Sequence, residues 1–426
     1  MKSSAPSPGR GKNPLRRFFS VLGPGVITGA ADDDPSGVAT YSIVGAQLGT
    51  SLLWTSFLTW PLMAVVQMAC ARIGMVTGQG LASALRKKWP RAILIAVILS
   101  LFAANTINIA ADLAGMADAA AMLSGVDSHL FILAFGVGIL WATVRLHYAQ
   151  IARVLKWLAL ALFAYIVTAI HVGPDWGAVL RDAFVPSWPK GSDAWKALVA
   201  LLGTTISPYL FFWQASEEVE EEKAIGRTRL RDREGATQPE LAERRLDVGV
   251  GTFFSNLVMF FIILTTALTL HRHGATRPQT SREIAEALRP LAGPFAEILY
   301  AVGLLGVGLL AIPTLAGSAA YAFAETFGWK QGLDRRLVQA RAFYAVVIAS
   351  TAIGMALDFA KIDPVSALYW SAIINGLLAP FLLVGILAVA CDSRVMRGQE
   401  IPVSSRILAG ITTALMFGAA IGMFVF

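Results

Sequence analysis

GPGVITGAADDDPSGV is the sequence of residues 23–38, and it lies within an apolar stretch that begins near residue 18. Pro35 removes a backbone donor and disfavours helical geometry at Asp34, and the following Ser36 and Gly37 lower the cost of leaving a helix. An ionised carboxylate in the middle of a membrane helix costs about 2.5 to 3.5 kcal/mol, so three consecutive aspartates require water, a cation or protonation. The stretch therefore predicts a membrane helix that is interrupted at a polar site.

A second stretch repeats this pattern. Residues 203–209 read GTTISPY, which puts Pro208 and a run of hydroxyl side chains inside another apolar helix. One proline alone is a weak signal, because membrane helices tolerate proline kinks. Interrupted helices at corresponding places in two inverted halves are a stronger signal, because they mark transport sites near the middle of the membrane. Carbonyl groups freed at such breaks can coordinate a cation, and the half-helices direct their dipoles toward it.

The whole chain has the composition of a membrane protein. Of its 426 residues, 56% are hydrophobic and 15% are charged, against roughly 25% charged in an average soluble domain. A membrane span needs about 20 apolar residues. We predict eleven spans, at residues 18–46, 49–75, 92–122, 130–148, 151–172, 195–216, 247–270, 294–326, 339–357, 364–391 and 404–426. These spans leave no contiguous region for a soluble catalytic domain, so we expect the chain not to be an enzyme.

The order of the spans predicts the architecture. An odd number of helices in one unit forces a second, corresponding unit to run inverted. We expect an all-α polytopic membrane protein with a first five-helix repeat at residues 18–172, an inverted second repeat at 195–391 and an eleventh span at 404–426. Residues 1–17 are predicted to form a disordered cytoplasmic tail. Gly25 and Gly29 form a small-residue pair, which predicts close packing of two helices.

The net charge of +7 is explained by topology. With a cytoplasmic N-terminus, 27 of the 35 Lys and Arg residues fall on the cytoplasmic side of the spans, as the positive-inside rule requires. We expect a multi-pass protein of the inner (plasma) membrane, in contact with the lipid bilayer, with the C-terminus outside and no nucleic-acid partner. Cys70 and Cys391 are the only cysteines in the sequence, which excludes a disulfide framework and a thiolate cluster.

At both breaks the chain resembles the Nramp family of divalent metal transporters. The family's first helix carries Asp-Pro-Gly-Asn and its sixth carries Ala-x-x-Met-Pro-His, and Asp34-Pro35 and Pro208 match these motifs. Asp112 begins an Asp-Leu-Ala stretch in span 3 that is similar to the family's Asp-Leu-Ala-Glu, which is associated with proton movement. The resemblance covers most of the chain. It implies a LeuT-type fold of 5+5 inverted helices with helices 1 and 6 broken, a divalent metal ion as substrate, and no cofactor.

Several motif positions differ from the family pattern. In register, the ligand Asn of the first helix is Gly37, and the Ala and Met of the sixth are Thr204 and Ser207. The two histidines expected after Pro208 and the Glu expected after Asp-Leu-Ala are replaced by Tyr209, Gln214 and Gly115. The missing thioether is the ligand that favours softer transition metals. The chain therefore resembles a divergent branch of the family, such as the Nramp-related magnesium transporters.

The chemistry of the two breaks also favours a hard ion. All five histidines lie at span ends or in loops, and neither break carries Met or Cys. An oxygen-only site favours Mg²⁺, and Mn²⁺ also accepts oxygen ligands. Asp34 would supply the charge, and the further expected metal ligands are Asp33, Thr204, Ser207 and the opened backbone near Gly37.

Other polar residues have a structural explanation beside the functional one. A polar stripe on one face of span 3 predicts either a proton or water path or a hydrogen-bond network between helices: Asp112, Asn108 and Asn105. Hydroxyl groups in membrane helices commonly bond back to the preceding turn, which is the alternative for the two hydroxyls of span 6. Three carboxylates are expected to line a water-filled vestibule: Asp32, Glu217 and Glu218. A solvated helix end is the alternative for the two glutamates.

Two other transporter classes stay open from the sequence. A LeuT-type symporter of amino acids or polyamines with a cation would also break spans 1 and 6, but three aspartates argue against an anionic substrate. The second alternative is proton-coupled, Nramp-like uptake of transition metals. A membrane sensor or scaffold would normally carry a soluble output domain, for which the spans leave no room. Divalent metal ions are the expected ligands; the sequence leaves the oligomeric state open, and it is compatible with a monomer.

Overall fold

The structure of this protein is a computed structural model, and it describes residues 24–146, 160–189, 192–333, 335–357 and 363–426. These residues fold almost entirely into helices. The longer ones are α3 (Pro35–Leu48), α4 (Thr55–Thr77), α6 (Arg91–Ser124), α7 (Ser128–Arg145), α11 (Ser192–Thr205), α12 (Pro208–Ala224), α14 (Gln238–Thr269), α17 (Ala296–Phe327), α18 (Arg341–Leu357), α19 (Pro364–Ala390) and α20 (Val403–Val425). The shorter ones are α2 (Pro24–Asp32), α5 (Leu81–Leu85), α9 (Ala164–Val172), α10 (Trp176–Phe184), α13 (Leu230–Arg233), α15 (Ser281–Ala285) and α16 (Arg289–Ala292).

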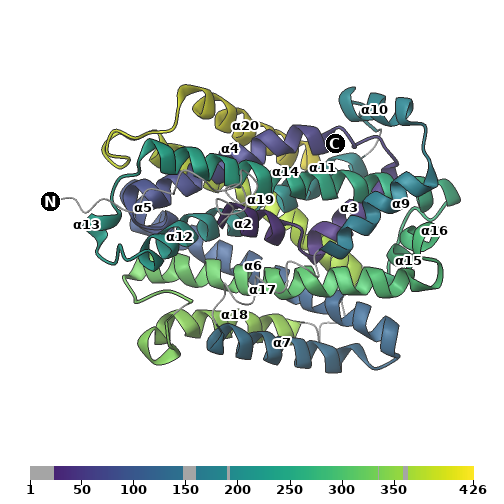
Figure 1. Ribbon diagram of the computed structural model, residues 1–426, viewed down its shortest axis with the longest axis horizontal. Helices are drawn as coiled ribbons and strands as arrows, with labels where there is room; N and C mark the ends of the chain where they lie inside the picture. Colours follow the sequence, from purple (N-terminus) through teal and green to yellow (C-terminus); the bar gives the residue numbers. More distant parts are fainter. Residues whose placement is uncertain (1–23, 147–159, 190–191, 334, 358–362) are drawn as a thin grey trace, which may run out of the picture.

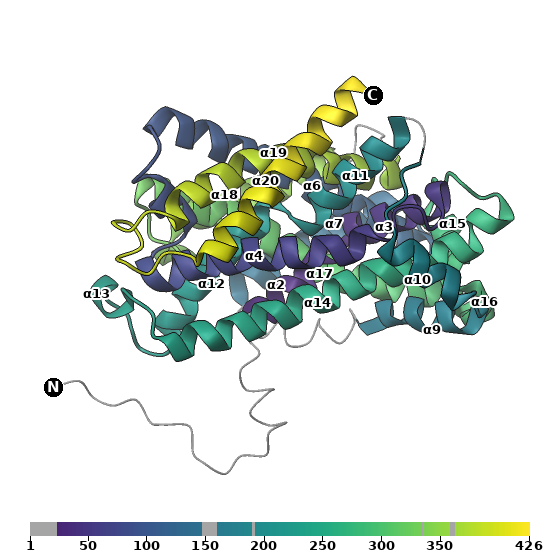
Figure 2. The same ribbon diagram turned by 90° about the horizontal axis from the view of Figure 1, so that it is seen from above.

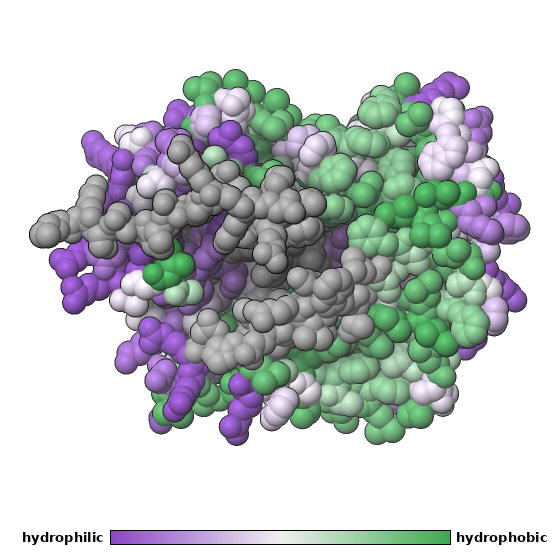
Figure 3. Space-filling model, in the orientation of Figure 1, coloured by the Kyte–Doolittle hydropathy of each residue, from purple (hydrophilic) through white to green (hydrophobic). Residues whose placement is uncertain are grey.

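Most long helices run along the longest axis of the molecule, with α2 near the centre (Figures 1 and 2). Short helices gather at the two ends: α5 and α13 at one, and α10, α15 and α16 at the other (Figure 1). The surface between these ends is largely apolar, while polar residues concentrate at the ends (Figure 3). Eight helical stretches among the described residues are long and apolar enough to cross a membrane. The predicted polytopic helical class is confirmed.

Both predicted helix breaks are present, and both follow the chemistry of proline. Helix α2 ends at Asp32 and α3 starts at Pro35, while α11 ends at Thr205 and α12 starts at Pro208. Each proline occupies the first helical position, where its missing N–H is not needed and its fixed φ angle suits the helix. The residues before the prolines, Asp34 and Ser207, have extended backbones. Each span is therefore two half-helices joined by an unwound pair of residues.

The other predicted spans agree with the observed helices to within a few residues, apart from the C-terminal end of span 6 and the N-terminal end of span 7. There α12 continues to Ala224, and α14 begins at Gln238, where a capping box of Thr237 and Glu240 starts the helix. The polar stretch between these two spans is thus mainly an extension of their helices. For span 5 only the portion from residue 160 is described, and the predicted tail at residues 1–17 lies outside the described residues.

The half-helices pack closely against their neighbours through glycine. A Cβ atom placed on Gly25 would lie 2.6 Å from the backbone nitrogen of Val248, and one on Gly29 would lie 2.5 Å from the backbone of Gly251 in α14. In the same way Gly203 of α11 contacts the backbone of Ala372 in α19. The close packing predicted for Gly25 and Gly29 is confirmed, and it brings α2 to the centre of the bundle.

Candidate metal site at the two helix breaks

Asp34 is fixed at the first break by the helix that follows it. It is the N-cap of α3, and its Oδ1 accepts hydrogen bonds from the amide of Gly37 at 2.7 Å and from the hydroxyl of Ser36 at 2.6 Å. Such a cap satisfies donors that the first turn of a helix leaves free. The side chain is 1% exposed. The other oxygen, Oδ2, faces helices α6 and α12 and is the one directed into the bundle.

A chain of amides links Asp34 to α6 and α19. The Nδ2 group of Asn108 donates to Asp34 Oδ2 and to Asp112 Oδ2, both at 3.1 Å, and its Oδ1 accepts from Asn375 Nδ2 at 3.2 Å. Asp112 Oδ1 is buried without a hydrogen-bond partner. The sequence thus correctly places Asn108 beside Asp112, and the structure adds a direct contact with the first break. Asn375 completes this network from span 10.

The second break meets the first through Tyr209. The Tyr209 hydroxyl donates to the backbone oxygen of Ala31 at 2.9 Å and lies 3.4 Å from Asp34 Oδ2. Thr204 lies against the first turn of α3, with its Oγ1 3.0 Å from where a Cβ on Gly37 would be. That Oγ1 and the hydroxyl of Tyr41 are both buried, and neither has a hydrogen-bond partner among the described residues. Free oxygen atoms therefore lie near Asp34 from both half-helices.

Two predicted ligands point to a different role in this structure. The Ser207 hydroxyl donates to the backbone oxygens of Gly203 at 2.8 Å and Thr204 at 2.7 Å, which is the structural alternative given for it above. Gly37 offers its N–H to Asp34, and an N–H group cannot ligate a cation. Gly37 thus positions the carboxylate through its N–H.

Asp32 and Asp33 face α14. Both contact the Ser255 hydroxyl, with oxygen separations of 2.6 Å to Asp32 Oδ2 and 3.3 Å to Asp33 Oδ1. Asp32 is fully buried and its Oδ1 has no hydrogen-bond partner in the part of the chain that the structure describes, while Asp33 is 5% exposed. The expected water-filled surroundings of Asp32 thus differ from the closed packing observed. Ser255 lacked any sequence signal, because an isolated serine in an apolar span usually bonds its own helix.

Three other predicted residues lie away from Asp34. Asn105 donates to the Leu315 carbonyl and to the Ser318 hydroxyl of α17, both at 2.9 Å, so it joins two helices. Glu218 is 1% exposed and therefore does not line an open vestibule as expected. Glu217, in the same turn of α12, is half-buried.

Glu218 belongs to an ion-pair cluster where the C-terminal half of α12 meets the N-terminal end of α14. Arg244 Nε lies 2.8 Å from Glu218 Oε1, its Nη1 lies 2.5 Å from Asp247 Oδ2, and its Nη2 pairs with Glu221. Asp247 Oδ2 also accepts from the amide of Gly25 at 2.7 Å, which connects the cluster to the start of α2. This cluster was not predicted, although Arg244 and Asp247 are three residues apart, a spacing that places opposite charges side by side on a helix.

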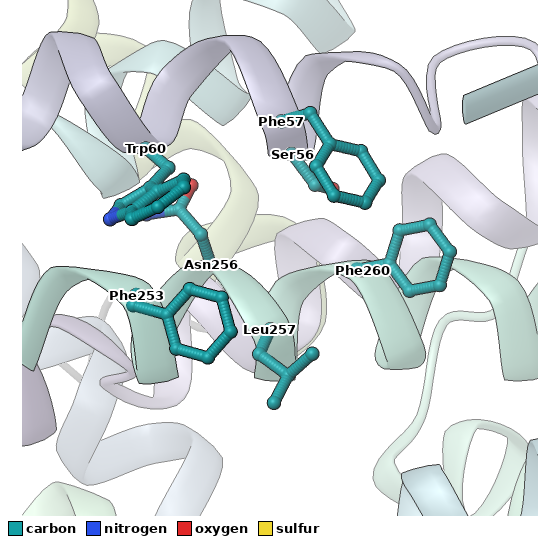
Figure 4. A pocket seen from close by; sticks show the side chains of 7 residues that line it. All are labelled: Ser56, Phe57, Trp60, Phe253, Asn256, Leu257 and Phe260. Atoms are coloured by element: carbon teal, nitrogen blue, oxygen red, sulfur yellow. The ribbon is translucent and has the colours of Figure 1, made fainter. Parts of the chain in front are cut away.

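A groove on the outer surface of the bundle is chemically unlike the breaks. It lies between α4 and α14, and its walls are mainly aromatic (Figure 4). Phe57, Trp60 and Phe253 are each about two-fifths exposed there. The residues that line it are Ser56, Phe57, Trp60, Phe253, Asn256, Leu257 and Phe260, and none of them is charged. The groove therefore offers no counter-charge for a cation.

The breaks can hold a hard cation with few charged ligands. Among the described residues, no group of three or more His, Cys, Asp or Glu side chains converges to hold a metal. The recorded hydrogen-bond partners of Asp34 are neutral: Ser36, Gly37, Asn108 and Tyr209. A buried carboxylate without a basic partner requires a proton or a cation. One carboxylate with neutral oxygens and water around it matches the ligand set that Mg²⁺ usually takes.

Comparison with known proteins identifies the family. Residues 25–426 match the family model described as natural resistance-associated macrophage protein-like. The chain belongs to the Nramp family. The resemblance seen at Asp34-Pro35 and Pro208 is thus confirmed over nearly the whole length of this Nramp protein.

Curated relatives of this Nramp protein are named as transporters. It is 28% identical over 399 residues to the divalent metal cation transporter MntH of Deinococcus radiodurans, covering 91% of this chain and 85% of that protein. The MntH of Mesorhizobium japonicum is 25% identical over 421 residues, covering 94% and 87%. These names confirm that the chain is not an enzyme, and a metal ion would be the substrate in place of a cofactor.

Solved structures confirm the fold of this Nramp protein. The manganese transporter of Eremococcus coleocola superimposes with a TM-score of 0.75 at 16% sequence identity, covering 96% of this chain and 87% of that one. A sodium-coupled sialic acid symporter gives a TM-score of 0.52 at 12% identity, covering 96% and 97%. At these identities the likeness concerns the LeuT-type helical fold, and it confirms the predicted fold class.

Proposed function

We propose that this Nramp protein is a secondary transporter that moves divalent metal cations, Mg²⁺ or Mn²⁺, across the cytoplasmic membrane by alternating access. The observation that carries the proposal is the buried carboxylate of Asp34 at a helix break, whose hydrogen-bond partners among the described residues are neutral, with the second break packed beside it. Relatives named as divalent metal cation transporters support the substrate class.

The ion preference follows from the ligand set. The positions that carry Met and His in the family motif carry Ser207 and Tyr209 here, so the ligands near Asp34 are oxygen atoms. Oxygen ligands favour hard ions, and Mg²⁺ keeps several of its waters when bound. Thr204, with a free buried hydroxyl, and Asp33 are the further ligands we propose. Asp112 and Asn108 form the proposed path for water or protons next to them.

The decisive experiment is uptake of Mg²⁺ and Mn²⁺ into liposomes that contain the purified protein. We expect Asp34→Ala to abolish uptake of both ions, because it removes the carboxylate at the break. Asp34→Asn should do the same while retaining an N-cap acceptor for α3. Asp182→Asn is the matched control: it changes a carboxylate in α10 whose partner is the Thr50 hydroxyl at 2.5 Å. Uptake by the Asp34 variants at the wild-type rate would overturn the proposal.

A further inference from the structure

The two prolines leave two carbonyl groups without their helical partners. In an α-helix the oxygen of residue i accepts from the N–H of residue i+4. Residue 35 is proline, so the oxygen of Ala31 loses this partner, and residue 208 is proline, so the oxygen of Thr204 loses its partner. Buried backbone acceptors are nearly always satisfied in native proteins. The structure shows what replaces the missing N–H groups.

A side-chain hydroxyl donates a hydrogen bond to each of these two carbonyl oxygens. Tyr209 donates to the Ala31 oxygen at 2.9 Å, and Ser207 donates to the Thr204 oxygen at 2.7 Å. The Tyr209 ring is fully buried, in contact with the apolar core of the bundle. Its hydroxyl also lies 3.4 Å from Asp34 Oδ2. The Tyr209 hydroxyl therefore contacts both the backbone oxygen of Ala31 in α2 and the oxygen of Asp34 that faces the site.

We propose that Tyr209 is a specificity-determining residue, because its hydroxyl withholds the Ala31 carbonyl from a cation bound at Asp34. The inference rests on the proposed divalent-cation transport. An ion that reaches Asp34 meets one protein oxygen fewer and retains water in its place. This arrangement suits Mg²⁺, which dehydrates reluctantly, and disfavours ions that bind through more protein ligands. The Tyr209 side chain does not itself ligate the ion.

The test is Tyr209→Phe, which keeps the buried ring and removes only the hydroxyl. The freed Ala31 oxygen then becomes available to the ion, and kcat/KM for Mn²⁺ relative to Mg²⁺ should rise about fivefold to tenfold, the factor that matches the net free energy of one hydrogen bond. Tyr300→Phe is the control, because Tyr300 is another buried tyrosine, 2% exposed, and lies in α17, outside the half-helices that form the breaks. It should leave the ratio unchanged.

The possible outcomes separate the inference from the proposed function. If the wild-type protein moves no divalent cation, the proposed function fails. If it transports Mg²⁺ or Mn²⁺ but the ratio is unchanged or falls in Tyr209→Phe, the inference is overturned. A purely structural brace between the half-helices would slow both ions by the same factor, so the ratio distinguishes it from a role in specificity.

A second measurement uses the wild-type protein and does not depend on the variant being folded. Mn²⁺ bound to the detergent-solubilised protein is examined by electron-nuclear double resonance in H₂O and in D₂O, which detects exchangeable water ligands. We expect several water ligands, because the Ala31 carbonyl is occupied by Tyr209. An ion coordinated almost wholly by protein oxygens would overturn the inference.

Discussion

At the scale of single residues, Ser207 allows a direct test of how the second break selects its ion. Ser207→Met places a thioether near Asp34 and should shift preference from Mg²⁺ toward Mn²⁺ and Cd²⁺. Competition between ions during uptake measures the shift. Ser207→Ala is the control, because it frees the Thr204 oxygen without adding sulfur. An unchanged selectivity series in Ser207→Met would show that position 207 does not face the ion.

The sequence predicts the residues of the site only where their chemistry is local. Asp34 and Pro35 are adjacent, and an aspartate before a proline in an apolar span has few explanations other than a break with a polar function. Tyr209 and Ser255 contact the aspartates across 175 or more positions in sequence. The residues next to them in the sequence do not predict these contacts, because the contacts depend on how α12 and α14 pack on α2.

At the scale of helices, Arg244 should stabilise the contact of the N-terminal ends of α2 and α14 with the C-terminal half of α12. Glu218 and Asp247 are almost fully buried beside it. Arg244→Gln leaves these carboxylates without a cation, and breaking a buried ion pair costs about 3 to 5 kcal/mol. We therefore expect a lower thermal unfolding temperature in detergent. Arg231→Gln removes an exposed partner of Asp232 and should change stability little. Equal unfolding temperatures for both variants would contradict the role of Arg244.

Helix positions follow from the sequence better than helix ends do. The eleven apolar stretches were predictable, because burial in lipid requires long uninterrupted apolar segments. The charged stretch between Glu217 and Asp247 has no apolar run, so the sequence indicates a solvated helical connector there, without the points at which α12 ends and α14 begins. Tertiary contacts such as the ion pairs of Arg244 with Glu218 and Glu221 hold these polar turns in place. The capping box of Thr237 and Glu240 was the local signal for the start of α14.

At the scale of the whole molecule, we predict that metal transport is weakly coupled, or not coupled, to protons. Tyr209 and Gln214 replace the two histidines of the family motif, and neither titrates near neutral pH. The amide of Asn108, which does not ionise, donates to both Asp112 and Asp34. Flux should follow the metal gradient and the membrane potential, worth about 2.3 kcal/mol per charge per 100 mV. A pH-sensitive dye inside liposomes at a clamped potential should show little or no acidification during uptake.

Acidification in proportion to the metal taken up would contradict this prediction. Loss of that acidification in Asp112→Asn would identify the aspartate as the proton carrier and would restore a proton symporter.

Membrane orientation is a second prediction for the molecule as a whole. The excess of basic residues predicts that α13 faces the cytoplasm and α16 the outside. Arg231 and Arg289 are exposed at these two ends, with 74% and 68% of their side chains accessible. In a background with Cys70 and Cys391 replaced by Ser, an impermeant maleimide should label Arg289→Cys in intact cells and Arg231→Cys only after permeabilisation. The opposite pattern would invert the proposed topology.

The contact between α2 and α14 has a consequence for how this sequence can vary. Because Gly25 and Gly29 lie directly against the backbone at Val248 and Gly251, the space that a side chain would need is already filled by main-chain atoms. Neighbouring side chains cannot move aside to admit even a methyl group. Saturation mutagenesis under selection for metal uptake should therefore recover glycine alone at positions 25 and 29. At Gly249, where no atom lies within 4 Å of an added Cβ, many residues should be accepted.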